Sequence, residues 1–81
     1  MAIVLSRHAE TVMAARDIAT DWVTQALTTP DVSLSDPADP TLMRSYRRIE
    51  AANGRILRVV HRQHEGDILV VTAFFDRGAK L

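Results

Sequence analysis

The sequence predicts an α+β domain in which two N-terminal helices pack on an antiparallel sheet of three to five strands. Three observations lead to this prediction. Apolar residues recur at helical spacing before Pro30, the dipeptide Asn53-Gly54 marks a tight turn, and strand-like apolar stretches flank that turn. The 81 residues are enough for one small domain, which we place at residues 1–81.

The first quarter of the chain predicts a short strand followed by a helix. Residues 2–5 are apolar and fit an edge strand. Ser6 is the expected N-cap, because its hydroxyl can accept a hydrogen bond from a free N–H of the first helical turn. An apolar stripe that includes Ala9 and Met13 predicts the helix over 7–17.

A second helix is predicted over 20–29, with Thr20 as its N-cap. Asp21 in the first turn interacts favourably with the positive end of the helix dipole. The helix ends before Pro30, because the residue that precedes a proline is disfavoured in helical conformation. The stripe expected to face the core is Trp22, Val23, Ala26 and Leu27.

The rest of the chain predicts strands joined by turns. The expected strands are a weak one at 31–35 and stronger ones at 43–51, 55–64 and 68–75. Asn53-Gly54 predicts a two-residue hairpin loop, since both residues tolerate positive φ. Glu65-Gly66 predicts the next turn.

The two-residue loops predict which side chains share a face of the sheet. With Asn53-Gly54 as the loop, Tyr46 lies opposite His61. One face is then expected to hold Tyr46, Arg48, His61 and Thr72. The other face is expected to hold Arg47, Arg58 and Arg62.

The basic residues are concentrated in one segment. Residues 44–64 hold six arginines against one acid, Glu50, which gives +5. Residues 1–43 give −4 and residues 65–81 give −1, so the net charge of zero is a sum of opposed blocks. A concentrated basic surface indicates an anionic partner, either nucleic acid or an acidic protein.

Tyr, His and Arg side chains on one sheet surface suit metal-independent cleavage of RNA. A base takes the 2′-hydroxyl proton, an arginine stabilises charge on the phosphorane, and an acid protonates the leaving oxygen. Tyr46 and His61 are therefore candidate catalytic residues. The candidate RNA-binding residues are Arg47, Arg48 and Arg62. In a simpler interpretation, Tyr46 and His61 form a cross-strand pair beneath the helices, with arginines extending to solvent.

Composition excludes several classes of site. The chain has no cysteine, and its three histidines lack the spacing of a metal site, so we expect neither a metal nor another cofactor. No secretory signal and no apolar stretch of about 20 residues is visible, so we expect a cytoplasmic protein without a membrane segment.

Four stretches carry a resemblance over nearly the whole chain. They are Ser6-Arg7-His8-Ala9 with Met13, Arg16 and Ile18; Val23, Ala26, Leu27 and Pro30; Gly54 to Val60; and Val70 to Phe75. In these the chain resembles a small bacterial domain family of unknown function. That family is itself similar to the RelE/BrnT group of type II toxins, which are small α+β ribonucleases inhibited by an antitoxin.

The resemblance implies a RelE-like fold, a small antitoxin partner, and RNA or the ribosome as target. The positions that match the family's recurrent pattern are His8, Arg16, Arg58 and Thr72. Of these, His8 and Arg58 are candidates for RNA chemistry, and Arg16 and Thr72 suit structural roles equally well. His8 thus joins His61 as a candidate proton-transfer residue.

Two hypotheses follow. In the first, the chain is a toxin-like ribonuclease in which Arg58 stabilises the phosphate, His8 or His61 transfers protons and Tyr46 orients the RNA. In the second, it is a non-catalytic interaction module that binds an acidic partner or forms a homodimer. The neutral net charge favours the second, because RelE-like toxins are usually strongly basic.

Overall fold

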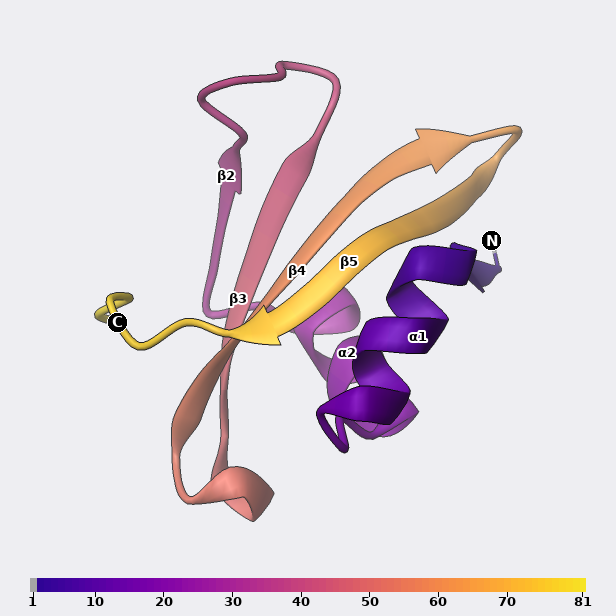
Figure 1. Ribbon diagram of the computed structural model, residues 1–81. Helices are drawn as coiled ribbons and strands as arrows, with labels where there is room; N and C mark the ends of the chain where they lie inside the picture. The colour runs from indigo at the N-terminus through magenta and orange to yellow at the C-terminus, as the bar shows by residue number, and fades with distance from the viewer. Residues whose placement is uncertain (1) are drawn as a thin grey trace.

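A computed structural model describes residues 2–81, which form two helices packed on one sheet of five strands (Figure 1). In chain order the elements are β1 Ile3–Leu5, α1 Arg7–Ala15, α2 Thr20–Thr28, β2 Val32–Ser35, β3 Met43–Ile49, a 3₁₀ turn Glu50–Ala52, β4 Arg55–His64 and β5 Asp67–Phe75. The predicted α+β class, both helices and all the predicted strands are confirmed, with ends that differ from the expected ones by up to two residues.

The sheet is mixed, so the prediction of a wholly antiparallel sheet is wrong. Its strand order is β1-β5-β4-β3-β2, and the pairs from β2 to β5 are antiparallel. β1 pairs parallel with β5, with Ile3 opposite Ile68 and Leu5 opposite Val70. The cause is the path of the chain. After β1 the chain forms α1 and α2 on one face of the sheet, and the last strand, β5, then lies beside β1 and runs in the same direction (Figure 1).

The first helix begins as predicted, and the second does not. The Ser6 hydroxyl accepts a hydrogen bond from the Ala9 N–H at 3.0 Å and donates one to the Val71 carbonyl at 2.9 Å, which ties the start of α1 to β5. Ala19 is the N-cap of α2 and makes no side-chain capping bond. Thr20, the predicted cap, is the first residue inside the helix; its carbonyl accepts a bond from Thr24.

The β3–β4 connection is longer than predicted. Asn53 and Gly54 both have positive φ, at 61° and 73°, as their residue types favour. A 3₁₀ turn precedes them, however, because Ala52 is buried in the core beside Ile49, and this pulls the chain inward before it reverses. Ile49 therefore pairs with Arg55, and the predicted two-residue loop is wrong.

The β4–β5 connection is the predicted two-residue loop, with φ of 52° at Glu65 and 83° at Gly66. His61 lies opposite Val70, as expected. Farther from the loop, a β-bulge at the next pair shifts the register by one residue, so that Val60 rather than Val59 lies opposite Thr72.

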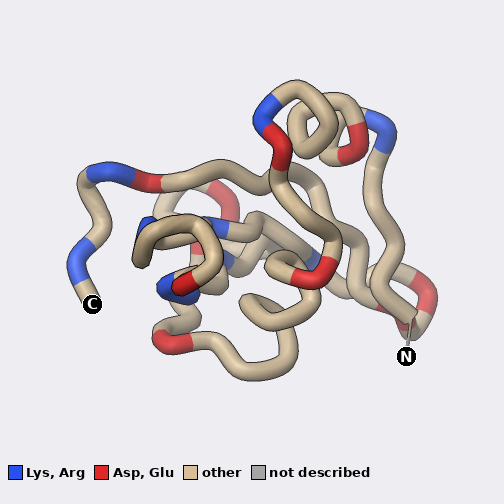
Figure 2. The backbone as a smooth tube through the Cα atoms, turned by 90° about the horizontal axis from the view of Figure 1, so that it is seen from below, with Lys and Arg blue, Asp and Glu red and all other residues tan. Residues whose placement is uncertain are grey.

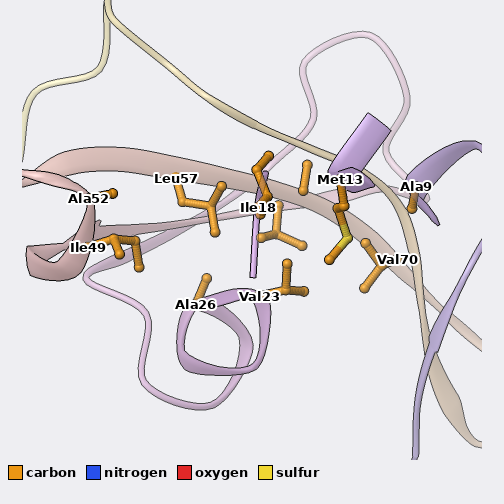
Figure 3. Close-up of a cluster of buried hydrophobic side chains, with 11 residues drawn as sticks. Ala9, Met13, Ile18, Val23, Ala26, Ile49, Ala52, Leu57 and Val70 are labelled. Atoms are coloured by element: carbon orange, nitrogen blue, oxygen red, sulfur yellow. The ribbon is translucent and has the colours of Figure 1, made fainter. Parts of the chain in front are cut away.

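The core lies between the helices and one face of the sheet (Figure 3). Most of the side chains that fill it are alanine, valine and isoleucine, with Met13 and Leu57. The largest fully buried side chains are Ile49, Leu57, Val23, Val59 and Val70. Trp22 packs partly buried against this cluster and meets the edge of Phe75, with ring centroids 6.0 Å apart. No helix in residues 2–81 is long and apolar enough to cross a membrane.

Candidate functional site on the open face of the sheet

The two faces of the sheet differ in their cover. The helices lie on one face, and the other carries neither helix (Figure 1). Leu57 and Val59 belong to the helix-covered core, so Arg58, between them on β4, points to the other side. We call that second side the open face.

The register places four of the six arginines of the basic segment on the open face. Tyr46 lies opposite Arg58 there, and the alternation of β3 and β4 adds the others. The arginines of the open face are Arg44, Arg48, Arg58 and Arg62. Figure 2 shows where the basic and acidic positions lie along the backbone.

Arg58 is held at the centre of this face by two aromatic rings. Its guanidinium carbon lies 5.5 Å from the centroid of Tyr46 and 4.8 Å from that of Phe74. These are cation–π distances, and they fix a long side chain in one place. The Arg58 side chain is 20% exposed, so it is reachable from solvent, while its Nε is buried without a hydrogen-bond partner among the described residues.

Asp76, just after β5, forms an ion pair with Arg58. This hydrogen bond from Arg58, together with one from the Gly78 N–H, lowers the pKa of Asp76. The residues that follow turn back over the open face, where they border a pocket of about 430 Å³. Its lining includes Tyr46, Arg58, Asp76, Lys80 and the aliphatic Val32 and Leu34 of β2.

The β2–β3 connection supplies a second carboxylate to the same face. Asp36 accepts a hydrogen bond from Arg44 Nε at 3.0 Å. The Ala38 N–H and Arg44 both lower the pKa of Asp36. Arg62 likewise lowers the pKa of Asp39, after the larger effect of the bond from Thr41. Much of the positive charge of the open face is therefore balanced by nearby carboxylates of the same chain.

Arg47, a predicted RNA contact, lies on the helix-covered side. Its guanidinium donates to the Thr29 carbonyl at 2.7 Å and so fastens the end of α2 to β3. Arg48, another predicted contact, is exposed on the open face and donates to the Gly54 carbonyl at 3.1 Å. Of the three predicted RNA contacts, Arg48 and Arg62 thus share the face of Arg58, and Arg47 does not.

His61 also lies on the helix-covered side, so its predicted pairing with Tyr46 is wrong. It pairs with Met43, because the β3–β4 register is three residues from the expected one. Its Nε2 is 2.8 Å from the hydroxyl of Ser45, which is 2% exposed and lies 3.1 Å from the hydroxyl of Ser33. Burial lowers the pKa of His61. The imidazole is therefore neutral at pH 7.

The four predicted catalytic residues do not converge. Tyr46 and Arg58 meet on the open face. His61 lies on the opposite side of the sheet, and His8 is exposed on α1, in the helix layer. The sheet stands between the histidines and the arginine that they were expected to assist.

Sequence reasoning missed three contributors to this face: Phe74, Asp76 and Lys80. Phe74 follows from the strand alternation only when the bulge in β5 is known. Asp76 and Lys80 belong to a short tail of irregular structure, which carries no periodic signal. The acid directly after β5 was a usable clue, because a strand end places its successor near the neighbouring strand.

The comparison with family models gives one finding. Residues 5–75 match the domain of unknown function DUF4258. The chain belongs to this family, as the resemblance to a family of unknown function predicted. Neither a curated protein nor a solved structure matches the chain.

Proposed function

We propose that the protein is a toxin-like RNA-binding domain that cleaves RNA without a metal ion on the open face of its sheet. Arg58 is the phosphate-binding residue in this proposal. Arg44, Arg48 and Arg62 bind neighbouring phosphates of the same strand. A small antitoxin would inhibit the protein by covering this face.

One observation carries the proposal: Arg58 is fixed between Tyr46 and Phe74, beside a pocket of about 430 Å³, on a face with three further arginines. A guanidinium held in this way is preorganised to bind two oxygens of a phosphate. Preorganised charge of this kind stabilises a phosphorane more than a mobile side chain does.

The position of Asp76 gives it the role that the histidines were predicted to have. When a phosphate binds Arg58, the ion pair between Arg58 and Asp76 breaks. The pKa of the Asp76 carboxyl then rises toward its usual value. Asp76 accepts the 2′-hydroxyl proton as the 2′ oxygen forms its bond to phosphorus. The bond to the 5′ oxygen breaks, and that oxygen takes a proton from water.

The test compares RNA cleavage by the wild-type protein with cleavage by Arg58→Gln. The substitution removes the charge but keeps much of the volume, and we expect at least a hundredfold loss of cleavage. Arg48→Gln is the matched control on the same face, and a smaller loss is expected because Arg48 lies outside the pocket. Equal activity of wild type and Arg58→Gln, or no cleavage of free or ribosome-bound RNA by the wild type, contradicts the proposal.

Asp76→Asn separates binding from chemistry. Loss of the carboxylate frees Arg58, so RNA should bind more tightly, while loss of the proton acceptor should slow cleavage. The dissociation constant and the single-turnover rate of the same RNA therefore move in opposite senses. If Asp76→Asn cleaves as fast as the wild type, the carboxylate has no part in proton transfer.

A second candidate function is favoured by exposed aliphatic side chains on the same face. Val32 and Leu34 of edge strand β2 are 36% and 53% exposed, and Val4 of the opposite edge strand is 44% exposed. Together with the arginines, they suit a non-catalytic module that binds an acidic, partly apolar protein. Harmless expression, uncleaved RNA and binding that is lost in Leu34→Ser would select this function.

A further inference from the structure

A second pocket gathers three arginines that the open face does not use. It has a volume of about 290 Å³ and lies between the end of α1, the start of β4 and the tail. Arg16, Arg55 and Arg77 line it, each from one of these three segments. Among the described residues, Asp76 is the one acidic residue that also lines it.

Arg55 is held in place by its neighbours. Its guanidinium carbon lies 4.1 Å from the centroid of Phe75, and its Nε donates to the Ala52 carbonyl at 3.0 Å. Phe75 itself packs against Trp22. One N–H of Arg55 is thus committed, and the flat guanidinium presents its remaining donors from a fixed position, as bidentate binding of an oxyanion requires.

The other two arginines are placed by the backbone. Arg16 is the C-cap of α1, and its N–H bonds to the Val12 carbonyl at 3.0 Å. Arg77 directly follows Asp76. The N–H of Asp76 donates to the Ile56 carbonyl at 2.9 Å, which holds this part of the tail beside β4. Both side chains are exposed, and neither has a salt-bridge partner among the described residues.

The charge of Asp76 is directed away from this pocket. Its carboxylate oxygens accept bonds from Arg58, on the open face, and from the Gly78 N–H at 2.9 Å. The negative charge of the Asp76 carboxylate therefore mainly neutralises the positive charge of Arg58. The pocket is left with an excess of guanidinium donors, and Gly54 at its wall has no side chain to fill it.

We propose that Arg16, Arg55 and Arg77 form a phosphate-binding site, separate from the open face. Its ligand is a phosphate group, supplied by free phosphate, a nucleotide or the RNA backbone. Neither Arg58 nor Tyr46 lines the site, and none of its three arginines takes part in the proposed RNA cleavage; Asp76 lines both pockets.

The test is a titration of the ¹⁵N-labelled protein with inorganic phosphate, with chloride added to keep the ionic strength constant. We expect saturable shifts at the amides of Gly54, Arg55 and Arg77. In the double variant Arg16→Gln/Arg77→Gln, phosphate should bind about tenfold more weakly or worse. Both side chains are exposed, so the fold should survive the change.

Arg7→Gln is the matched control, because Arg7 is an exposed arginine at the other end of α1. It should bind phosphate like the wild type. Parallel titrations use a nucleoside 5′-monophosphate and a short oligoribonucleotide. The compound that binds most tightly identifies the source of the phosphate group. Unchanged affinity in the double variant, or shifts that chloride alone reproduces, would overturn the site.

Discussion

The two faces of one sheet use the same residue types in opposite ways. On the helix-covered face, Arg47 and Arg55 bond to backbone carbonyls and brace the fold. On the open face, Arg58 lies over two aromatic rings and pairs with the carboxylate of Asp76. Arg48, on the open face, also donates to a backbone carbonyl, so the contrast rests on the carboxylate and the two aromatic rings that Arg58 contacts.

The comparison also explains why the open face is the functional candidate. Core burial determines the residues of the covered face: Leu57, Val59 and Ala73 are all 0% exposed. On the open face Tyr46 is also buried, at 8% exposed, but it lies outside the helix-covered cluster and packs beside Arg58, whose side chain is 20% exposed. A charged side chain that is held by aromatic rings and still reachable from solvent is a candidate for contact with a ligand or partner.

The largest effect should come from adjacent residues on opposite faces of β4. Leu57→Ala should lower the free energy of unfolding by about 2–5 kcal/mol, because it opens a cavity in the core. Ile56→Ala, on the open face, should cost clearly less, since Ile56 is only partly buried. Urea unfolding measures both. Equal losses would mean that the two faces contribute equally to stability, contrary to this account.

Removal of the Asp76 carboxylate should have the next largest effect. Asp76→Asn should cost about 1 kcal/mol, as expected for a charged hydrogen bond near the surface. The folded-state pKa of Asp76 lies below its ordinary 3.8, so the stabilisation is present above that pH and is lost as pH falls through the folded value. Wild type and variant should therefore converge in stability in acid. A difference that persists at low pH would assign the effect to tail packing instead.

The turns show how far sequence reasoning reached. The Asn53-Gly54 dipeptide marked the reversal and its positive φ values, but not the loop length, which depends on the burial of Ala52. That burial is a tertiary effect and leaves no mark in the dipeptide. The three-residue change in register moved His61 to the opposite face from Tyr46, because side chains alternate along a strand.

The β4–β5 turn gives the opposite lesson. The two-residue loop at Glu65-Gly66 was predicted correctly. The predicted β4–β5 register is also correct from this loop to His61. The bulge beyond it was not predictable, because no residue there demands an irregular conformation. Arg58 was predicted as a site residue, but its aromatic partners could not be predicted, because they depend on both registers together.

His61 should cause a smaller effect of pH on stability. Its folded-state pKa lies below the ordinary 6.5, so the unfolded chain takes up the proton first as pH falls. Stability should therefore decrease as pH falls below about 6.5, and His61→Gln should flatten this part of the Tm profile. His8→Gln is the control, because His8 is exposed. An unchanged profile in His61→Gln would show that another group titrates.

The smallest change in stability should follow Leu34→Ser. Leu34 is 53% exposed, so the free energy of unfolding should stay within about 0.5 kcal/mol of the wild type. Its effect should appear in association instead, because it removes apolar surface from the open face. Analytical ultracentrifugation over a range of concentrations measures this. A large loss of stability would place Leu34 in the core.

The most direct test of the central claim uses side-chain methyl groups on the two faces. Val59 and Val60 are adjacent on β4, and the alternation of the strand turns them to the covered and open faces respectively. In a ¹³C-methyl titration with a short oligoribonucleotide, we expect saturable shifts at the methyl groups of Val60, Val32 and Leu34. The methyl signals of Val59 and Leu57 should not change. These shifts should weaken in Arg58→Gln. Saturable shifts at Val59 and Leu57 instead, or equal shifts with and without Arg58, would contradict the assignment of the open face as the RNA-binding surface.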